Sequence, residues 1–266
     1  MRIVLGLEYD GSAFCGWQTQ AQACGVQDAL DRALTEVAGE RIVTACAGRT
    51  DAGVHALAQV VHFDVLAQRP LTAWTRGANA LLPAGVAVNW SKQVGEEFHA
   101  RFSATGRRYV YCLLNRPQRP GLLHQRVGWF HQTLDTDAMR WAARCLIGEH
   151  DFSAFRATEC QARSPVKVLR ELQITQRGET IRFEFAADAF VQHMVRTIVG
   201  SLIYIGSGRQ PPGWMEELLR GRDRRRAAPT FSPAGLYLAG VDYDAVWALP
   251  PRPDVAALED AMLAGA

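Results

Sequence analysis

The stretch that decides the fold is VQDALDRALTEV, residues 26–37. Its six apolar residues begin at Val26 and fall at i, i+3, i+4, i+7, i+8 and i+11, where Val37 is the last. This spacing places all six on one face of an α-helix. Gly39 follows closely, and glycine is common where a helix ends. The sequence therefore predicts an amphipathic helix with one face packed against the rest of the protein.

Strand patterns lie on both sides of this helix. Residues 2–8 place Ile3, Leu5 and Leu7 on one face, which is typical of a half-buried strand. Further strands are predicted at residues 41–46, 57–65 and 86–94, and a second helix at residues 72–81. The resulting order, β-α-β-β-α-β, is the order of a ferredoxin-like unit.

The rest of the chain repeats this order of elements. Strands are predicted at residues 109–114, 166–175, 181–185 and 236–241, and helices at residues 136–147 and 190–205. We expect two ferredoxin-like α+β halves, at residues 1–105 and 106–245, each with an antiparallel or mixed sheet and helices on one face. Residues 246–266 form a C-terminal tail rich in Pro and Ala, in which residues 254–263 suit a short helix.

Composition limits the compartment. Of the 266 residues, 48% are apolar, which suffices for one large domain or two compact halves. No run of eighteen apolar residues exists, so no membrane helix is predicted. The N-terminal apolar stretch is broken by Glu8 and Asp10, too early for a signal peptide. We therefore expect a cytoplasmic protein.

Cysteine and charge patterns limit the chemistry. The six cysteines form no C-x-x-C pair and no cluster with zinc-ligand spacing, so we expect free thiols, mostly in the core, and no metal. The net charge is only +2, but 27 of the 29 basic residues are Arg. Arg suits phosphates and stacks on bases, whereas a GC-rich genome would explain the same excess without any nucleic acid.

The densest group of chemically active side chains lies in CAGRTDAGVHA, residues 46–56, between two predicted strands. Gly48 and Gly53 bracket a turn in which a ligand could approach the backbone. The loop holds a cation, a hydroxyl, a carboxylate and an imidazole: Arg49, Thr50, Asp51 and His55. Loops held by strands often bear function. An ordinary turn, in which Asp51 bonds its own backbone, is the alternative interpretation.

Residues 48–56 resemble the active-site motif of the tRNA pseudouridine synthase A family. The resemblance continues, in family order and spacing, through short motifs from residue 3 to residue 243. They are YDG at 9–11, GWQ at 16–18, FHARFSA at 98–104, RYVY at 108–111, DF at 151–152, FR at 155–156, AF at 189–190, MVR at 194–196, VG at 199–200 and GLYL at 235–238. The set is highly specific, although each short piece alone is common.

The resemblance implies a cofactor-free isomerisation of uridine to pseudouridine at positions 38, 39 and 40 of the tRNA anticodon stem-loop. Uracil leaves C1′ of its ribose, rotates, and is rejoined through C5. By the resemblance Asp51 is the catalytic nucleophile or base. The sequence leaves open whether it attacks C6, attacks C1′ or removes a C2′ proton. A hydrolase triad of Thr50, His55 and Asp51 also fits the composition, but neighbours in one loop seldom converge as a triad.

Four further residues resemble family positions around the target base. Arg49 matches the residue that flips the base from its stack, with an ion pair to Asp51 as the structural alternative. Tyr109 matches the tyrosine that stacks on uracil. Arg196 matches the arginine that pairs with the catalytic aspartate, and a stem lying along apolar surface is its alternative. Leu236 matches a residue that packs against the base, for which core packing is an equally simple interpretation.

Seven residues are predicted to bind RNA: Arg69, Phe98, Arg101, Arg107, Arg108, Arg156 and Arg163. Phosphate contacts from such arginines would position RNA without reading its sequence. A second arginine cluster, residues 220–226, follows a short predicted helix at 214–219. Favourable placement of cations at a helix C-terminus explains that cluster better than RNA contact does.

Together these features predict an isomerase whose two sheets meet at a central basic catalytic cleft. The resemblance also implies a homodimer in which one tRNA touches both subunits. Two other classes fit parts of the sequence: a non-catalytic RNA-binding module built from ferredoxin-like halves, and a carboxylate-dependent hydrolase of small molecules. Mapping pseudouridine in tRNA incubated with the purified protein tests the isomerase. A single-turnover assay on uridine-labelled tRNA separates it from the binding module, and the hydrolase predicts no salt-sensitive tRNA binding.

Overall fold

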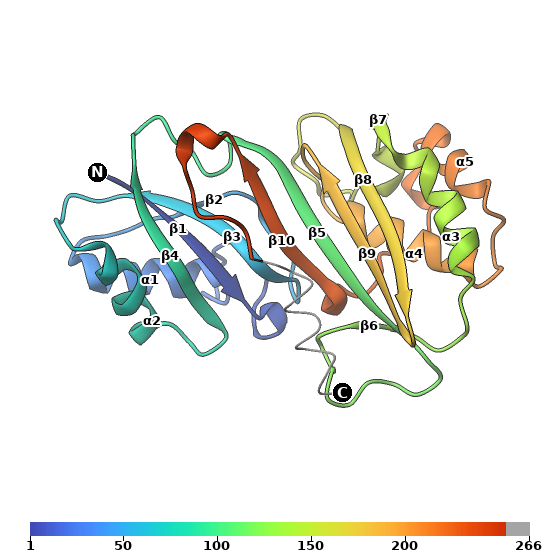
Figure 1. Cartoon of the computed structure of the whole chain (residues 1–266), viewed down its shortest axis with the longest axis horizontal. Helices are drawn as coiled ribbons and strands as arrows, with labels where there is room; N and C mark the ends of the chain where they lie inside the picture. Colours follow the sequence, from blue (N-terminus) through green and yellow to red (C-terminus); the bar gives the residue numbers. More distant parts are fainter. Residues whose placement is uncertain (254–266) are drawn as a thin grey trace. The chain divides into compact units, whose positions relative to one another are not determined.

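The chain crosses between two structural units twice, after Thr105 and after Leu236 (Figure 1). The structure is a computed structural model that describes residues 1–253. Unit 1 comprises Met1–Thr105 and the described residues from Tyr237 to Pro253, and unit 2 comprises Gly106–Leu236. The strand predicted at residues 236–241, which was expected to close the second half, lies in unit 1 except for Leu236. The helix suited to residues 254–263 lies outside the described residues.

The sheet of unit 1 has the strand order of a ferredoxin-like unit. Its strands are β1 (Arg2–Tyr9), β2 (Ala45–Cys46), β3 (His55–Asp64) and β4 (Val86–Val94). β1 lies between β4 and β3, and β2 pairs with β3, all antiparallel. β10 (Leu236–Tyr243) returns from unit 2 and pairs with β3 in parallel, with Tyr237 opposite His55. The predicted β-α-β-β-α-β order is therefore confirmed in this unit.

The first helix follows the sequence pattern closely. α1 (Val26–Ala38) buries the predicted apolar face, and the Asp28 carboxylate accepts the backbone N–H of Gly25 at its start. It ends at Gly39, whose φ of 74° suits glycine. The second predicted helix is a π-helical turn, Ala73–Gly77, that continues into α2 (Ala78–Leu81).

β2 is much shorter than the strand expected at residues 41–46. The backbone N–H of Ile42 donates to the Thr35 hydroxyl, and that of Thr44 donates to the Asp31 carboxylate. Side chains of α1 therefore take the backbone donors that a longer strand would use. This leaves only Ala45 and Cys46 to pair with β3, immediately before the 48–56 loop.

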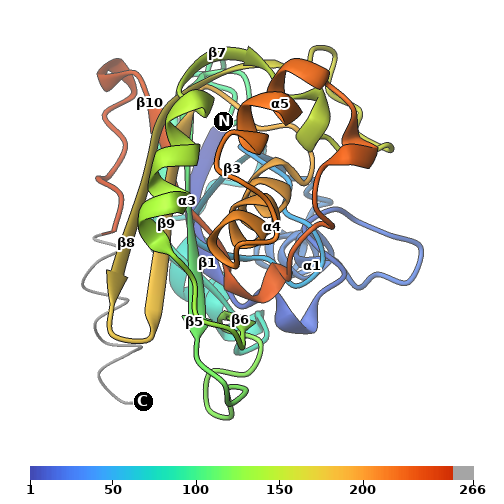
Figure 2. The ribbon, with the colours of Figure 1, turned by 90° about the vertical axis from the view of Figure 1, so that its right-hand side faces the viewer.

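Unit 2 contains five strands and places its helices on one side of them. Its strands are β5 (Ala104–Asn115), β6 (Gly128–Phe130), β7 (Gly148–Asp151), β8 (Val166–Arg177) and β9 (Thr180–Ala187). They pair in the order β5-β9-β8-β7, with β6 beside β5. Figure 2 shows α3 (Thr136–Ala143), α4 (Met194–Gly206) and α5 (Trp214–Gly221) on one side of β8 and β9. The α+β class predicted from the sequence is correct.

Several elements of unit 2 differ from expectation, and α3 ends at Ala143 rather than at residue 147. α4 begins at Met194 rather than at residue 190, because His193 has a φ of 67°, which no α-helical residue adopts. Neither β6 nor β7 was predicted, because strands of three and four residues are too short to show a periodic pattern.

Candidate active site

The 48–56 loop forms a tight turn in unit 1 between β2 and the start of β3. The carbonyl of Asp51 accepts the backbone N–H of Val54 at 3.1 Å, and Gly53 between them has a φ of 76°. Glycine adopts such a φ without steric cost, so Gly53 permits the turn. Arg49 is exposed, Asp51 is half-buried, and only 7% of Thr50 is exposed. The loop therefore presents Arg49 and Asp51 and turns Thr50 inward.

Segments from β1 and the following loop hold this turn in place. The Thr50 hydroxyl lies 2.8 Å from that of Tyr9, and the Thr50 carbonyl accepts the backbone N–H of Trp17 at 3.0 Å. At Gly16 a Cβ would lie 2.8 Å from the Thr50 carbonyl oxygen, closer than real side chains approach. Gly16 is therefore required by close contact of two backbones. The YDG and GWQ motifs thus act as a frame for the candidate catalytic loop.

His55 is enclosed beside this frame. Only 1% of its surface is exposed, and its ring stacks on Tyr237 of β10 with centroids 4.7 Å apart. Its Nδ1 lies 3.1 Å from both the Gly11 backbone nitrogen and an Asp10 carboxylate oxygen. A hydrolase triad would need the Thr50 hydroxyl to contact His55. Here the Thr50 hydroxyl contacts Tyr9, and His55 contacts Asp10 and Tyr237.

Two cysteines beside this frame form a disulfide, which corrects the expectation of six free thiols. Cys15 and Cys24 are bonded, with their Cα atoms 5.4 Å apart. The backbone N–H of Cys15 donates to the Cys24 carbonyl, which brings the two residues together across a loop that the sequence spacing did not reveal. Among the described residues, Cys46, Cys112, Cys145 and Cys160 remain free thiols.

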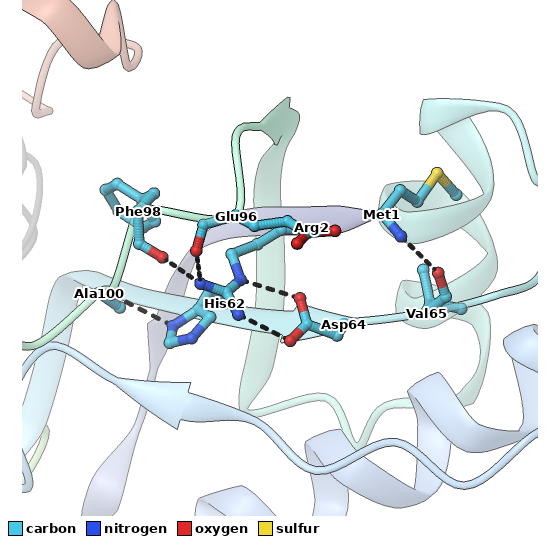
Figure 3. Close-up of polar contacts among 8 residues, drawn as sticks. All are labelled: Met1, Arg2, His62, Asp64, Val65, Glu96, Phe98 and Ala100. Atoms are coloured by element: carbon cyan, nitrogen blue, oxygen red, sulfur yellow. Dashed lines mark hydrogen bonds and ion pairs between the residues drawn. The ribbon is translucent and has the colours of Figure 1, made fainter.

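A network around Arg2 holds the FHARF segment, residues 98–102 (Figure 3). The Arg2 guanidinium makes two hydrogen bonds to Asp64, at 2.8 and 2.7 Å, and donates to the carbonyls of Glu96 and Phe98. His62 Nδ1 accepts the Ala100 backbone N–H at 3.1 Å. Burial, with His99 and Arg2 nearby, lowers the pKa of His62 to about 4, so this nitrogen stays an acceptor at neutral pH.

The same network separates the roles of two predicted RNA-binding residues. Phe98 is fully buried against Tyr243 and Trp247, at ring distances of 5.3 and 5.1 Å. Its side chain offers no surface to RNA, and its role in this structure is to anchor the segment. Arg101 is exposed, and its guanidinium lies 5.7 Å from the centroid of the exposed Phe102 ring. Arg69, also in unit 1, is exposed as well.

In unit 2, β5 divides its predicted site residues between two faces. Tyr109 is half-buried with its ring 5.0 Å from that of Phe190, and Arg107, on the same face, donates to the Asp188 carbonyl at 3.0 Å. Arg108 points to the opposite face, where it bridges to Glu171 at 3.2 Å. Tyr109 and Arg107 can therefore serve one ligand surface, which Arg108 does not share.

The other predicted residues of unit 2 have clear local contacts. The Arg196 guanidinium donates to the Phe231 carbonyl at 2.8 Å, and Leu236 is 5% exposed. Arg156 donates to the carbonyls of Cys160 and Ala162 and so shapes the loop that holds the exposed Arg163. In the arginine cluster after α5, Arg225 pairs with Asp223 at 2.9 Å and Arg220 with Glu216 at 2.6 Å.

Residues 1–253 contain no helix long and apolar enough to cross a membrane. Within the same residues, His, Cys, Asp and Glu side chains form no group of three or more that could hold a metal ion.

Comparison with known proteins agrees with the motif pattern. A family sequence model described as tRNA pseudouridine synthase matches residues 7–103 and 142–244. Proteins named tRNA pseudouridine synthase A are similar over nearly their whole length. Those of Thiobacillus denitrificans and Dechloromonas aromatica are each 60% identical over 250 residues, which is 94% of this chain and 96% and 95% of theirs. That of Chromobacterium violaceum is 58% identical over 97% of this chain and 99% of its own.

One solved structure with a related shape is only weakly similar. The match to the structure titled "Crystal Structure of a Cbf5-Nop10-Gar1 Complex" covers 85% of this chain and 60% of that chain. The TM-score of 0.34 and the identity of 10% are too low to support an argument. The sequence matches are decisive because they cover both units and include the 48–56 loop. The chain belongs to the tRNA pseudouridine synthase family of isomerases.

Proposed function

We propose that this protein isomerises uridine to pseudouridine at positions 38, 39 and 40 of the tRNA anticodon stem-loop, with Asp51 as the catalytic carboxylate. The observation that supports Asp51 most is its place on a tight turn that is fixed from two sides. The turn leaves Asp51 half-buried and Arg49 exposed, and the buried Thr50 lies between them in the sequence. A fixed carboxylate beside an exposed cation suits chemistry on an anionic polymer.

The reaction conserves all atoms of the nucleotide. The C1′–N1 bond breaks, a C1′–C5 bond forms, the proton on C5 is released and N1 gains a proton. An aspartate oxygen can act as nucleophile or base in this exchange. We leave attack on C6, attack on C1′ and removal of the C2′ proton as three routes for Asp51. None of them calls for a cofactor.

The remaining site residues have proposed roles in holding the base. Arg49 would displace the target uridine from its stack and occupy the gap or hold a phosphate. The Tyr109 ring, packed edge-on against Phe190, would stack on the uracil. Arg196 would pair with Asp51, and Leu236 would pack against the base.

Phosphate contacts would supply most of the tRNA affinity. We assign them to Arg69, Arg101, Arg107, Arg108, Arg156 and Arg163, with Phe98 anchoring Arg101. We further propose that the protein acts in the cytoplasm as a homodimer in which one tRNA touches both subunits.

Replacing Asp51 by Asn tests the central assignment. Asn retains the shape but loses the charge and the nucleophile, so pseudouridine formation should fall to the assay floor while tRNA affinity changes little. The matched control is Asp137→Asn on α3, which removes an equal charge from a side chain that is 90% exposed and should keep normal turnover. Thermal melting verifies that both variants fold. A folded Asp51→Asn protein that isomerises uridine near the normal rate would exclude Asp51 as catalyst.

A further inference from the structure

Gln59 is a polar side chain in the buried part of β3. It is 0% exposed, and its neighbours Val60 and Val61 are 6% and 0% exposed. Burying an amide without hydrogen bonds costs free energy, so a buried Gln is expected to have hydrogen-bond partners that an apolar residue could not bind. The contacts of Gln59 show what that is.

The Gln59 amide reaches the start of the candidate catalytic loop. Its Nε2 donates to the Gly48 carbonyl at 2.7 Å and, through a longer contact of 3.4 Å, to the Tyr9 hydroxyl oxygen. Its own oxygen accepts the backbone N–H of Val60 at 3.2 Å. The amide nitrogen therefore has two acceptors and the amide oxygen one donor, and the two contacts of the nitrogen lead toward the loop.

Tyr9 extends this chain of hydrogen bonds to the residue before Asp51. Because its oxygen accepts from Gln59, its own hydrogen can be donated to Thr50 Oγ1, 2.8 Å away. The pair is buried, with Tyr9 4% and Thr50 7% exposed. Hydrogen bonds in such low-dielectric surroundings are stronger than in water and reinforce one another along a chain.

We propose that Gln59, Tyr9 and Thr50 are positioning residues for the isomerisation: they fix the backbone of residues 48–50 and thereby aim the Asp51 carboxylate. This inference rests on the proposed role of Asp51. The Gln59–Gly48 bond holds the loop three residues before Asp51, and the Tyr9–Thr50 bond holds it at the adjacent residue. Misplacing a reacting group by about 1 Å can cost roughly 100-fold in rate.

A double-mutant cycle on Tyr9 and Thr50 tests the pair. Tyr9→Phe and Thr50→Val each remove one hydroxyl and keep the shape. The readouts are the single-turnover rate at saturating tRNA, followed by tritium release from C5-labelled uridine, and the Kd for tRNA. We expect each variant, and Gln59→Met, to slow the step by about 10- to 100-fold with Kd within about threefold of normal. The double variant should be no slower than the slower single one.

Two controls separate positioning from stability. Thr50→Ser keeps the hydroxyl and should restore the rate to within about threefold of normal. Asn79→Ala removes an amide that binds the backbone N–H and carbonyl of Val88, outside the loop and its frame, and should lower the melting temperature but not the rate. Near-normal rates in folded Gln59→Met and Tyr9→Phe, additive effects in the cycle, or equal slowing by Asn79→Ala would each overturn the proposal.

Asp51→Asn, measured alongside, distinguishes the two levels of inference. If Asp51→Asn is inactive while the variants at Gln59, Tyr9 and Thr50 keep near-normal rates, only the positioning roles fail. If Asp51→Asn is active, the assignment of Asp51 fails, and the positioning proposal fails with it.

Discussion

Neighbouring residues in the candidate catalytic loop have opposite surroundings. Thr50 is almost fully buried and bonded to Tyr9 and Trp17, whereas Arg49 is exposed and Asp51 half-buried. The inward residue anchors the chain between two residues that are more exposed. Removing the Thr50 hydroxyl should consequently slow the chemical step although Thr50 is almost fully buried.

Tyr109 allows a residue-level test of base stacking. Stacking needs the ring and not the hydroxyl, so Tyr109→Phe should keep the isomerisation rate and tRNA affinity within about threefold of normal. Tyr109→Ala should lose about 1–3 kcal/mol of base contact. Single-turnover rates and tRNA binding measure both. A Phe variant that binds normally but reacts slowly would assign proton transfer to the hydroxyl, and near-normal rates for both variants would leave Tyr109 a packing residue.

His62 predicts how stability depends on pH. Its pKa is about 4 in the folded protein, mainly through burial, against about 6.5 when unfolded. The unfolded chain therefore binds the proton more readily, so this contribution is complete above pH 6.5 and is lost as pH falls from 6.5 toward 4. His62→Asn retains an acceptor for the Ala100 N–H and should weaken this dependence. Urea unfolding at pH 7.5 and pH 5 measures it, and equal pH slopes in both proteins would contradict the assignment.

At the scale of secondary-structure elements, strong apolar periodicity was enough to predict a helix. Features that depend on individual hydrogen bonds between distant residues could not be predicted. The bounds of α1 could be predicted because six apolar residues repeat at helical spacing, and the β-α-β-β-α-β order of unit 1 followed. The length of β2 could not, since side chains of α1 take its backbone donors. The site loop was identifiable from its glycines and charges. The Gln59–Gly48 bond was hidden because it depends on tertiary contact, although a lone Gln among buried valines was a usable signal.

The Cys15–Cys24 bond gives a prediction for the segment that frames the loop. Closing so short a loop should stabilise the fold by about 2–3 kcal/mol, so reduction or a Cys15→Ser/Cys24→Ser variant should lower the melting temperature. Thiol titration of the unfolded protein should find four reactive cysteines without reductant and six after reduction. Six reactive thiols in unreduced protein would contradict the bond.

At the scale of the whole molecule, the 29 basic residues are nearly balanced by 27 acidic ones. The formal charge is +2, and several arginines are already paired with carboxylates, as Arg2 is with Asp64 and Arg116 with Glu179. Binding to a polyanion would therefore depend on a subset of local arginines rather than on a uniform field.

Salt dependence of tRNA binding tests that subset. If several phosphates are neutralised, log K should fall linearly with log salt, by about 0.7 to 0.9 per contact. Arg101→Ala or Arg69→Ala should flatten the slope by roughly one contact's worth. Arg225→Ala is the matched control, because this exposed side chain pairs with Asp223 after α5, and it should leave the slope unchanged. Slopes that stay equal in the first two variants would remove both residues from the RNA surface.

The double crossing of the chain has a consequence for synthesis on the ribosome. Unit 2 is one continuous stretch, Gly106–Leu236, whereas unit 1 is assembled from both ends of the chain. A nascent chain therefore completes the whole of unit 2 before Tyr237 emerges to pair with β3 and stack on His55, next to the loop that bears Asp51. Chains released early would lack this support, so the candidate active site is among the last parts of the protein to be finished.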